Sequence, residues 1–157
     1  MRHFSIVLVV LLATFSPVWL RNPKVQAEDY DLVHNMKRLD SGDGPVMGNA
    51  SHGSYIAFRQ IDLKNLEQFT YRLSSLNREA TIEARLDSAT GLVISTLTYQ
   101  VTKDWNNFVE LSAPVKAIIG VRDLYFVLQK PGEPNDDLIH LDWIYFQRKN
   151  WAGTIKM

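Results

Sequence analysis

The chain has 157 residues, is 46% hydrophobic and 11% aromatic, and carries 17 acidic and 17 basic residues, so its formal net charge is zero. This length and apolar content suit a single domain with a self-sufficient core, and zero net charge argues against a nucleic-acid partner, whose binding needs a basic surface. Cysteine is absent, which excludes a disulfide framework, a zinc–thiolate cluster and a thiol nucleophile.

The N-terminus predicts an export signal. Arg2 precedes an apolar run over residues 4–15 that is too short to span a bilayer comfortably. We expect residues 1–20 to form the signal peptide. Cleavage after Ala27 fits the small-residue rule better but would remove Gln26, and a retained signal anchor is a third possibility. An exported chain without cysteine suits a bacterial periplasm or cell surface, so we expect a secreted, periplasmic or surface protein.

The mature domain is predicted over residues 21–149, followed by a C-terminal tail over 150–157. Residues 31–54 hold glycines and turn-forming residues with little periodicity, which predicts a long irregular loop. From Tyr55 onward, short runs alternate apolar and polar side chains and are separated by turn signals. The predicted strands cover residues 55–59, 69–74, 82–87, 92–101, 124–128 and 138–146. Short strands at this spacing predict an all-β, antiparallel β-sandwich.

One segment has helical as well as strand character. Apolar side chains at positions 63, 66 and 73 have helical spacing behind Asp62, which could cap a helix. The alternation over residues 69–73 fits a strand better, and the sequence offers no other helix to pack against it. We therefore predict a strand here.

The last apolar run, residues 138–146, is interrupted by Asp142. A carboxylate in such a strand needs a partner, because desolvation disfavours its charged form. Near the other end of the chain, Gln26 and Glu28 alternate with apolar neighbours and would share one strand face. Oxygen ligands converging from two strands suit a hard cation such as calcium. The alternative is that Glu28 and Asp142 are separate surface or strand-end carboxylates.

Motifs of catalysis are missing from the sequence. It contains no Gly-x-Ser-x-Gly elbow, phosphate-binding loop or His-Glu-x-x-His motif. A glycosidase needs two carboxylates across a cleft, and the acidic pairs here are Glu83 with Asp87 and Asp136 with Asp137. The first pair falls on an exposed strand face and the second in a proline-rich loop, which favours surface charge. We predict that the chain is not an enzyme.

An ordered set of segments over residues 24–148 resembles family 6 of the carbohydrate-binding modules. The segments are residues 26–30, 53–58, 61–63, 82–87, 90–91, 102–105, 123–127 and 141–146. The resemblance implies a jelly-roll sandwich with a structural calcium ion between the first and last strands. Its side-chain ligands would be Gln26, Glu28 and Asp142, with backbone carbonyls from the long loop. Gln26 stands where the family often has glutamate, so the site carries less negative charge.

The resemblance also implies a sugar site at the loop end of the sandwich. Tyr55 and Trp105 occupy the positions of two aromatic residues that enclose the sugar, and His140 occupies that of an asparagine that hydrogen-bonds its hydroxyls. The apolar face of a pyranose stacks on aromatic rings while polar groups contact the hydroxyls, and a neutral imidazole can donate and accept. In the alternative interpretation Tyr55 and Trp105 are packing residues and His140 is a satisfied strand residue.

These observations predict a secreted, non-catalytic β-sandwich that binds a polysaccharide or oligosaccharide. We expect a monomer that acts alone or with a separate catalytic or envelope protein. The alternative is a sugar-inactive sandwich that serves as a protein-interaction or structural domain at the cell envelope, which an exposed apolar patch would favour.

Overall fold

The computed structural model describes residues 23–133 and 137–149. The predicted signal peptide, the C-terminal tail and Asp136 lie outside these residues. Within them, no helix combines the length and the apolar character that crossing a membrane requires.

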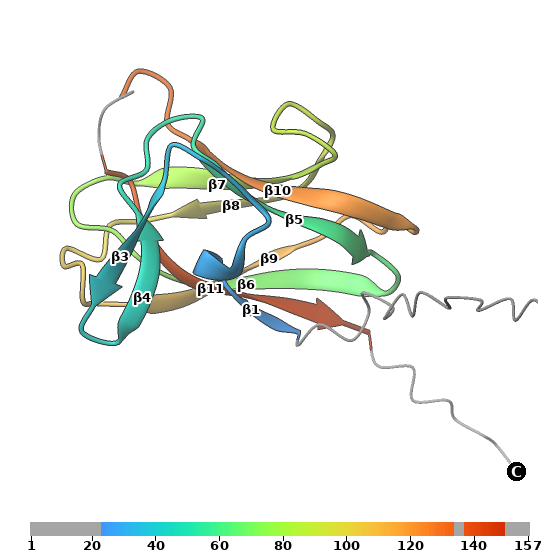
Figure 1. Ribbon diagram of the computed structural model, residues 1–157, viewed down its shortest axis with the longest axis horizontal. Coiled ribbons are helices and arrows are strands. Elements are labelled where there is room, and N and C mark those ends of the chain that lie inside the picture. Colours follow the sequence, from blue (N-terminus) through green and yellow to red (C-terminus); the bar gives the residue numbers. More distant parts are fainter. Residues whose placement is uncertain (1–22, 134–136, 150–157) are drawn as a thin grey trace, which may run out of the picture.

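The described chain forms two antiparallel sheets that lie one above the other (Figure 1). The six-stranded sheet has the order β3 (Lys37–Ser41), β4 (Gly44–Gly48), β11 (His140–Arg148), β6 (Leu66–Ser74), β9 (Val109–Pro114), and β1 (Lys24–Gln26) also pairs with β11. The five-stranded sheet has the order β2 (Leu32–His34), β5 (Tyr55–Asp62), β10 (Val121–Gln129), β7 (Ala80–Leu86), β8 (Val93–Tyr99). The predicted antiparallel β-sandwich is confirmed.

An aromatic cluster fills the space between the sheets. Phe69 of β6 meets Phe126 of β10 and Phe146 of β11 edge to face, with 5.2 Å between ring centroids in each pair. Edge-to-face pairs stabilise a core by about 0.5–1.5 kcal/mol each beyond the burial of their area. Phe69, Tyr71 and Leu73 are fully buried and lie at alternate positions of β6, so the strand prediction for this segment is confirmed.

The prediction of an irregular loop over residues 31–54 is wrong. The segment contains β2 and the hairpin of β3 and β4, in which Ser41 pairs with Gly44. Gly42 and Asp43, which indicated a loop, instead form the tight turn of this hairpin. The sequence does not predict this hairpin because most side chains of β3 are exposed, so β3 shows no apolar alternation.

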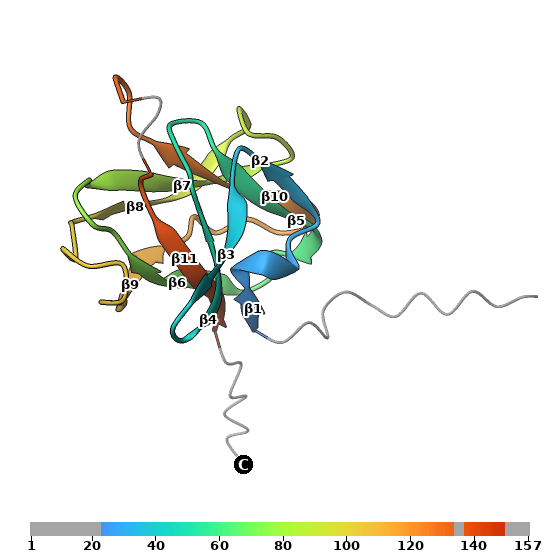
Figure 2. The same ribbon diagram turned by 60° about the vertical axis from the view of Figure 1, so that its left-hand side comes forward.

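The predicted first strand is shorter than expected. β1 pairs with β11, with Val25 opposite Ile144, so the two terminal segments of the domain lie side by side (Figure 2). The strand ends at Gln26, and a 3-10 helix, η2 (Ala27–Asp29), follows. Ala27 is fully buried, because η2 turns the chain inward against β11 and β4. The expectation that Gln26 and Glu28 share one strand face is therefore wrong.

Candidate functional site

Trp105 and His140 form a stacked pair at one end of the sandwich. Trp105 lies in the loop between β8 and β9, and its carbonyl accepts a 2.7 Å hydrogen bond from the Ser74 hydroxyl at the end of β6. His140 is the first residue of β11 and pairs with Ser74 in the sheet. The two ring centroids are 4.0 Å apart and the ring planes differ by 17°. One face of the half-buried indole is thus covered by the imidazole.

The imidazole of His140 is held on several sides. Its Nε2 atom lies 3.7 Å from a carboxylate oxygen of Asp137, whose other oxygen accepts a 3.1 Å hydrogen bond from the Ala50 amide. Gly48 lies beneath the ring, where a Cβ atom would come within 2.7 Å of the His140 Cδ2 atom. The Nδ1 atom is buried and has no hydrogen-bond partner in the described chain. A buried nitrogen without a partner costs about 1–3 kcal/mol, so a hydroxyl that reached it would stabilise this site.

Tyr55 has different neighbours. It opens β5, and its ring stacks on His34 at 5.4 Å and 22° and meets Tyr125 at 5.2 Å and 60°. The neighbouring Ile56 belongs to the core, so strand alternation directs Tyr55 to the outer face of the five-stranded sheet. The structure therefore groups Trp105 with His140 and groups Tyr55 with His34 and Tyr125.

His34 and Tyr125 were missed by the sequence analysis. Tyr125 falls between Leu124 and Phe126 in a run whose alternation already placed those two side chains inward. The same alternation could have placed Tyr125 on the outer face. His34 lies in β2, inside the segment that was interpreted as a loop, and its position opposite Tyr55 depends on strand pairing.

Asp142 has a partner, and it is an arginine. The Asp142 Oδ2 atom binds Arg72 of β6, and Arg72 also forms a 3.0 Å ion pair with Asp43. The guanidinium lies over the Phe108 ring, 4.3 Å from its centroid. Burial alone would lower the pKa of Arg72, but the hydrogen bonds and charges of Asp142 and Asp43 outweigh burial and raise this pKa. The charge of the half-buried Asp142 is thus compensated inside the sheet.

Glu28, one of the three predicted calcium ligands, has a buried side-chain oxygen, Oε2, that lacks a hydrogen-bond partner among the described residues, which is costly for a carboxylate. It lies in η2, which packs against β11 and β4, and Gln26 pairs with Trp143, the neighbour of Asp142. In the described chain no three His, Asp or Glu side chains converge on one point. A cation here would therefore also need the Gln26 amide oxygen and main-chain carbonyls.

The acidic pair Glu83 and Asp87 is engaged by arginines. Glu83 accepts a 2.9 Å hydrogen bond from Arg85, and Asp87 accepts a 3.0 Å bond from Arg122. The hydrogen bond from Arg122 is the main cause that lowers the pKa of Asp87. The acid of a glycosidase requires a shift in the opposite direction, so this pair has the character of structural ion pairs.

A family model described as carbohydrate binding module (family 6) matches residues 26–148. A family 6 module from Clostridium cellulolyticum, solved in complex with xylose, is 26% identical, with a TM-score of 0.74 over 80% of this chain and 96% of that chain. A module from Clostridium stercorarium, solved in complex with cellobiose, is 25% identical, with a TM-score of 0.70 over 80% of this chain and 93% of that chain.

A curated relative is a much longer enzyme. Endo-1,4-beta-xylanase A of Thermoclostridium stercorarium is 27% identical over 134 residues, which cover 83% of this chain and 24% of the enzyme. The chain thus spans about a quarter of the length of this relative. A β-1,3-glucan-binding module from Bacillus halodurans, at 23% identity and a TM-score of 0.73 over 79% of this chain and 94% of that chain, shares the fold.

Proposed function

The chain belongs to family 6 of the carbohydrate-binding modules, and we propose that it binds a polysaccharide or oligosaccharide, without cleaving it, at the pair formed by Trp105 and His140. The observation that carries this proposal is a half-buried indole stacked on an imidazole whose buried Nδ1 atom lacks a partner. An aromatic face binds the apolar face of a pyranose, and unsatisfied polar atoms beside it select the hydroxyls.

Polar side chains at the same rim extend this surface. Asn106 follows Trp105 and is exposed, and Asn49 is exposed beside Gly48, which lies beneath His140. Asn49 adopts a left-handed backbone conformation with φ of 55°, which asparagine tolerates better than most residues. We propose that these amides contact sugar hydroxyls around the stacked pair.

Tyr55 is proposed as a second, separate aromatic contact. The family resemblance pairs it with Trp105, but the two rings have different partners, and Tyr55 lies on β5 whereas Trp105 lies in the loop between β8 and β9. A sugar at Tyr55 would lie on the outer face of the five-stranded sheet beside His34 and Tyr125. Under this proposal, loss of either aromatic surface weakens retention on a long polysaccharide, whereas a short oligosaccharide depends on one of them.

The ligands of similar modules support a proposal for the ligand class. The similar modules were solved with xylose and with cellobiose, and the curated relative is named as an endo-1,4-beta-xylanase. We propose that this chain binds a β-1,4-linked pyranose polymer such as xylan. By the same comparison it would work outside the cell or at its surface, beside a catalytic domain or a separate enzyme that acts on the polymer.

We also propose a structural calcium ion held by Gln26, Glu28 and Asp142 with main-chain carbonyls. The buried, unpartnered Oε2 atom of Glu28 supports it, since a cation would compensate that charge where no donor does. A ligand that binds only the folded state stabilises it by mass action. Chelation should therefore lower the melting temperature of the wild type. Chelation should not change the melting temperature of Glu28→Gln. A wild-type melting temperature that does not respond to added calcium would refute the ion.

Isothermal titration with xylan and with cello-oligosaccharides tests the binding site. We expect Trp105→Ala to abolish measurable binding to short oligosaccharides. Tyr145→Ala is the matched control, because Tyr145 is a partly exposed aromatic residue of β11 that stands away from the stacked pair. Unchanged affinity in Trp105→Ala would show that the site is elsewhere, and a wild type that binds no glycan would refute the function.

The second candidate function is a sugar-inactive protein-interaction domain. Ile119, two residues before β10, and Val121, its first residue, are 83% and 57% exposed, and contiguous exposed apolar patches mark interaction surfaces. Two results together would favour this candidate. The wild type would bind none of the glycans tested, and it would associate in a concentration-dependent way that Ile119→Ser abolishes.

A further inference from the structure

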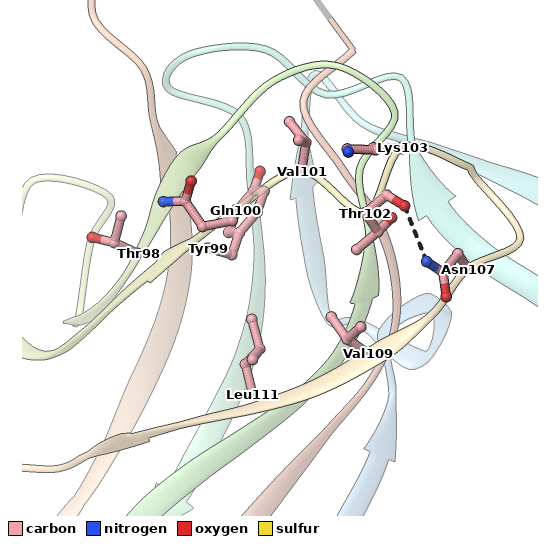
Figure 3. A pocket seen from close by; sticks show the side chains of 9 residues that line it. All are labelled: Thr98, Tyr99, Gln100, Val101, Thr102, Lys103, Asn107, Val109 and Leu111. Atoms are coloured by element: carbon pink, nitrogen blue, oxygen red, sulfur yellow. Dashed lines mark hydrogen bonds between the residues drawn. The ribbon is translucent and has the colours of Figure 1, made fainter.

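A pocket of about 470 Å³ lies between the end of β8 and the start of β9 (Figure 3). These strands are the edges of the two different sheets, so the pocket opens where one edge of the sandwich meets the other. Its size falls in the range of about 300–1,000 Å³ that is usual for small-molecule sites. Trp105 is not among its lining residues, which makes it a different surface from the stacked pair.

The pocket combines an apolar side with a neutral polar rim. Val109 and Leu111 project from β9 toward the residues that follow β8 (Figure 3). Gln100 and Asn107 bring amide groups to the rim, whereas the Thr102 hydroxyl is already bonded to the backbone of Ser75 and Asp104. An apolar side with neutral hydrogen-bonding groups around it matches a pyranose ring, which has apolar C–H faces and hydroxyls at its edge.

The charge of the pocket is positive. Among the described residues that line it, Lys103 is the one charged side chain and none is a carboxylate. An anionic ligand therefore meets a cation there without repulsion from the lining, and a pairing between a charged donor and a charged acceptor is stronger than a neutral hydrogen bond.

The backbone holds Lys103 at this rim. Lys103 has φ of 67°, a conformation that is disfavoured for residues with a Cβ atom. It is maintained because the amides of Thr102 and Lys103 both donate to the Ser75 carbonyl, at 2.8 and 3.1 Å. The Asn107 side chain closes the same loop by donating to the Thr102 carbonyl at 3.0 Å (Figure 3). These hydrogen bonds fix the backbone at Lys103, although its side chain is exposed.

We propose that this pocket binds an acidic sugar, a hexuronate residue of a polysaccharide, whose carboxylate pairs with Lys103 and whose ring packs on Val109 and Leu111. The inference rests on the proposed glycan-binding function. Lys103 and Trp105 are two residues apart on one loop, so a neutral main chain at the stacked pair and an acidic branch in the pocket can belong to the same polymer.

The test compares two forms of one ligand. Glucuronic-acid-substituted xylan oligosaccharides and their carboxyl-reduced counterparts share a skeleton and differ only in charge. We expect the wild type to bind the acidic form about 3- to 10-fold more tightly in isothermal titration at low salt, and added salt should shrink this difference. Lys103→Gln should abolish the difference and leave the affinity for the reduced form unchanged. Lys116→Gln, which removes another exposed lysine, should preserve it.

Gln100→Glu is a second test variant, and it leaves Lys103 and its left-handed backbone conformation unchanged. It places a carboxylate on an exposed lining residue and should weaken binding of the acidic form alone. Equal wild-type affinity for both forms, or a preference that survives Lys103→Gln, would overturn the hexuronate site and leave the proposed function standing. Failure of the wild type to bind either form would refute both.

Discussion

The imidazole of His140 lies nearly parallel to the indole of Trp105, with 4.0 Å between the ring centroids and 17° between the planes. The imidazole therefore covers one indole face, so under the proposed function a sugar would stack on the other. His140 also brings a buried nitrogen without a partner to this contact. The imidazole thus restricts the proposed site, and because its Nδ1 atom is buried, a sugar hydroxyl would reach that atom only after the ring moved.

Replacing His140 by asparagine should increase the affinity for neutral xylo-oligosaccharides. The smaller amide uncovers more of the indole and removes the buried Nδ1 atom, while it keeps a donor and an acceptor for sugar hydroxyls. One additional hydrogen bond corresponds to about 0.5–1.5 kcal/mol, or roughly a 2- to 10-fold gain in affinity. Isothermal titration measures this change directly.

The control for that variant is His140→Phe, which keeps a ring on the indole and removes both nitrogens. If the imidazole nitrogens contact sugar, this variant should bind more weakly than the wild type. An asparagine variant that binds no better than the phenylalanine variant would show that His140 acts only as packing.

Gly48→Ala should destabilise the protein and disturb the stacked pair together. An added Cβ atom would approach His140 Cδ2 and Leu39 Cδ1 to 2.7 Å each, a separation at which atoms must move. Leu39 can shift its methyl group, whereas the imidazole is confined by Trp105. Overpacking of this kind costs about 1–3 kcal/mol. We expect a lower urea midpoint and altered tryptophan fluorescence, while Gly42→Ala, where a Cβ meets no atom within 4 Å, should leave the fluorescence unchanged.

The strands that face the core on one side could be predicted from the sequence. Apolar alternation over residues 82–87 and 124–128 locates most of β7 and β10, because each of these strands buries one face. The same rule fails for β3, whose side chains are mostly exposed, and for η2, where three residues are too few to show a period. Patterning therefore identifies an element only where burial selects its side chains.

The site was less predictable than the fold. Trp105 and His140, both expected from the sequence to contact sugar, lie together in the structure, whereas the ring of Tyr55, the expected partner of Trp105, lies against His34 and Tyr125. Which rings meet depends on strand register and on sheet order, and neither is encoded in local spacing. For the same reason the partner of Asp142 was sought in the first strand, whereas Arg72 lies on the neighbouring β6.

Arg72→Met should destabilise the protein, because it leaves the carboxylate of Asp142, whose side chain is 16% exposed, without its cation. Loss of one partner of a half-buried pair costs about 1–3 kcal/mol, which corresponds to a fall in melting temperature of roughly 2–12 °C for a domain of this size. Arg59→Met, at an exposed position of β5, should have little effect.

The response of Arg72→Met to calcium tests whether Asp142 is a calcium ligand. If Asp142 is also a calcium ligand, removal of the neighbouring guanidinium should strengthen calcium binding, and saturating calcium should recover part of the lost stability. A melting temperature of Arg72→Met that does not respond to calcium, beside a wild type that does, would remove Asp142 from the ligand set and leave Glu28 as its carboxylate.

Asp87→Asn should lower stability at neutral pH and become indistinguishable from the wild type in acid. Arg122 is the main cause that lowers the pKa of Asp87 in the folded protein, from an ordinary value of 3.8. The stabilisation is therefore complete above pH 3.8 and is lost as pH falls through the lower folded-state pKa. Both side chains are more than 40% exposed, at 48% for Asp87 and 43% for Arg122, so the effect is small and salt-sensitive. Asparagine tolerates the left-handed φ of 65° at this position, so the variant removes the charge without straining the backbone.

Urea unfolding across the acid range measures the difference in stability between the variant and the wild type. Arg122→Gln should lower stability by the same amount, and the double variant should be no less stable than Asp87→Asn. A difference that persists below the folded-state pKa would show that Asp87 stabilises the turn through its shape rather than through its ion pair.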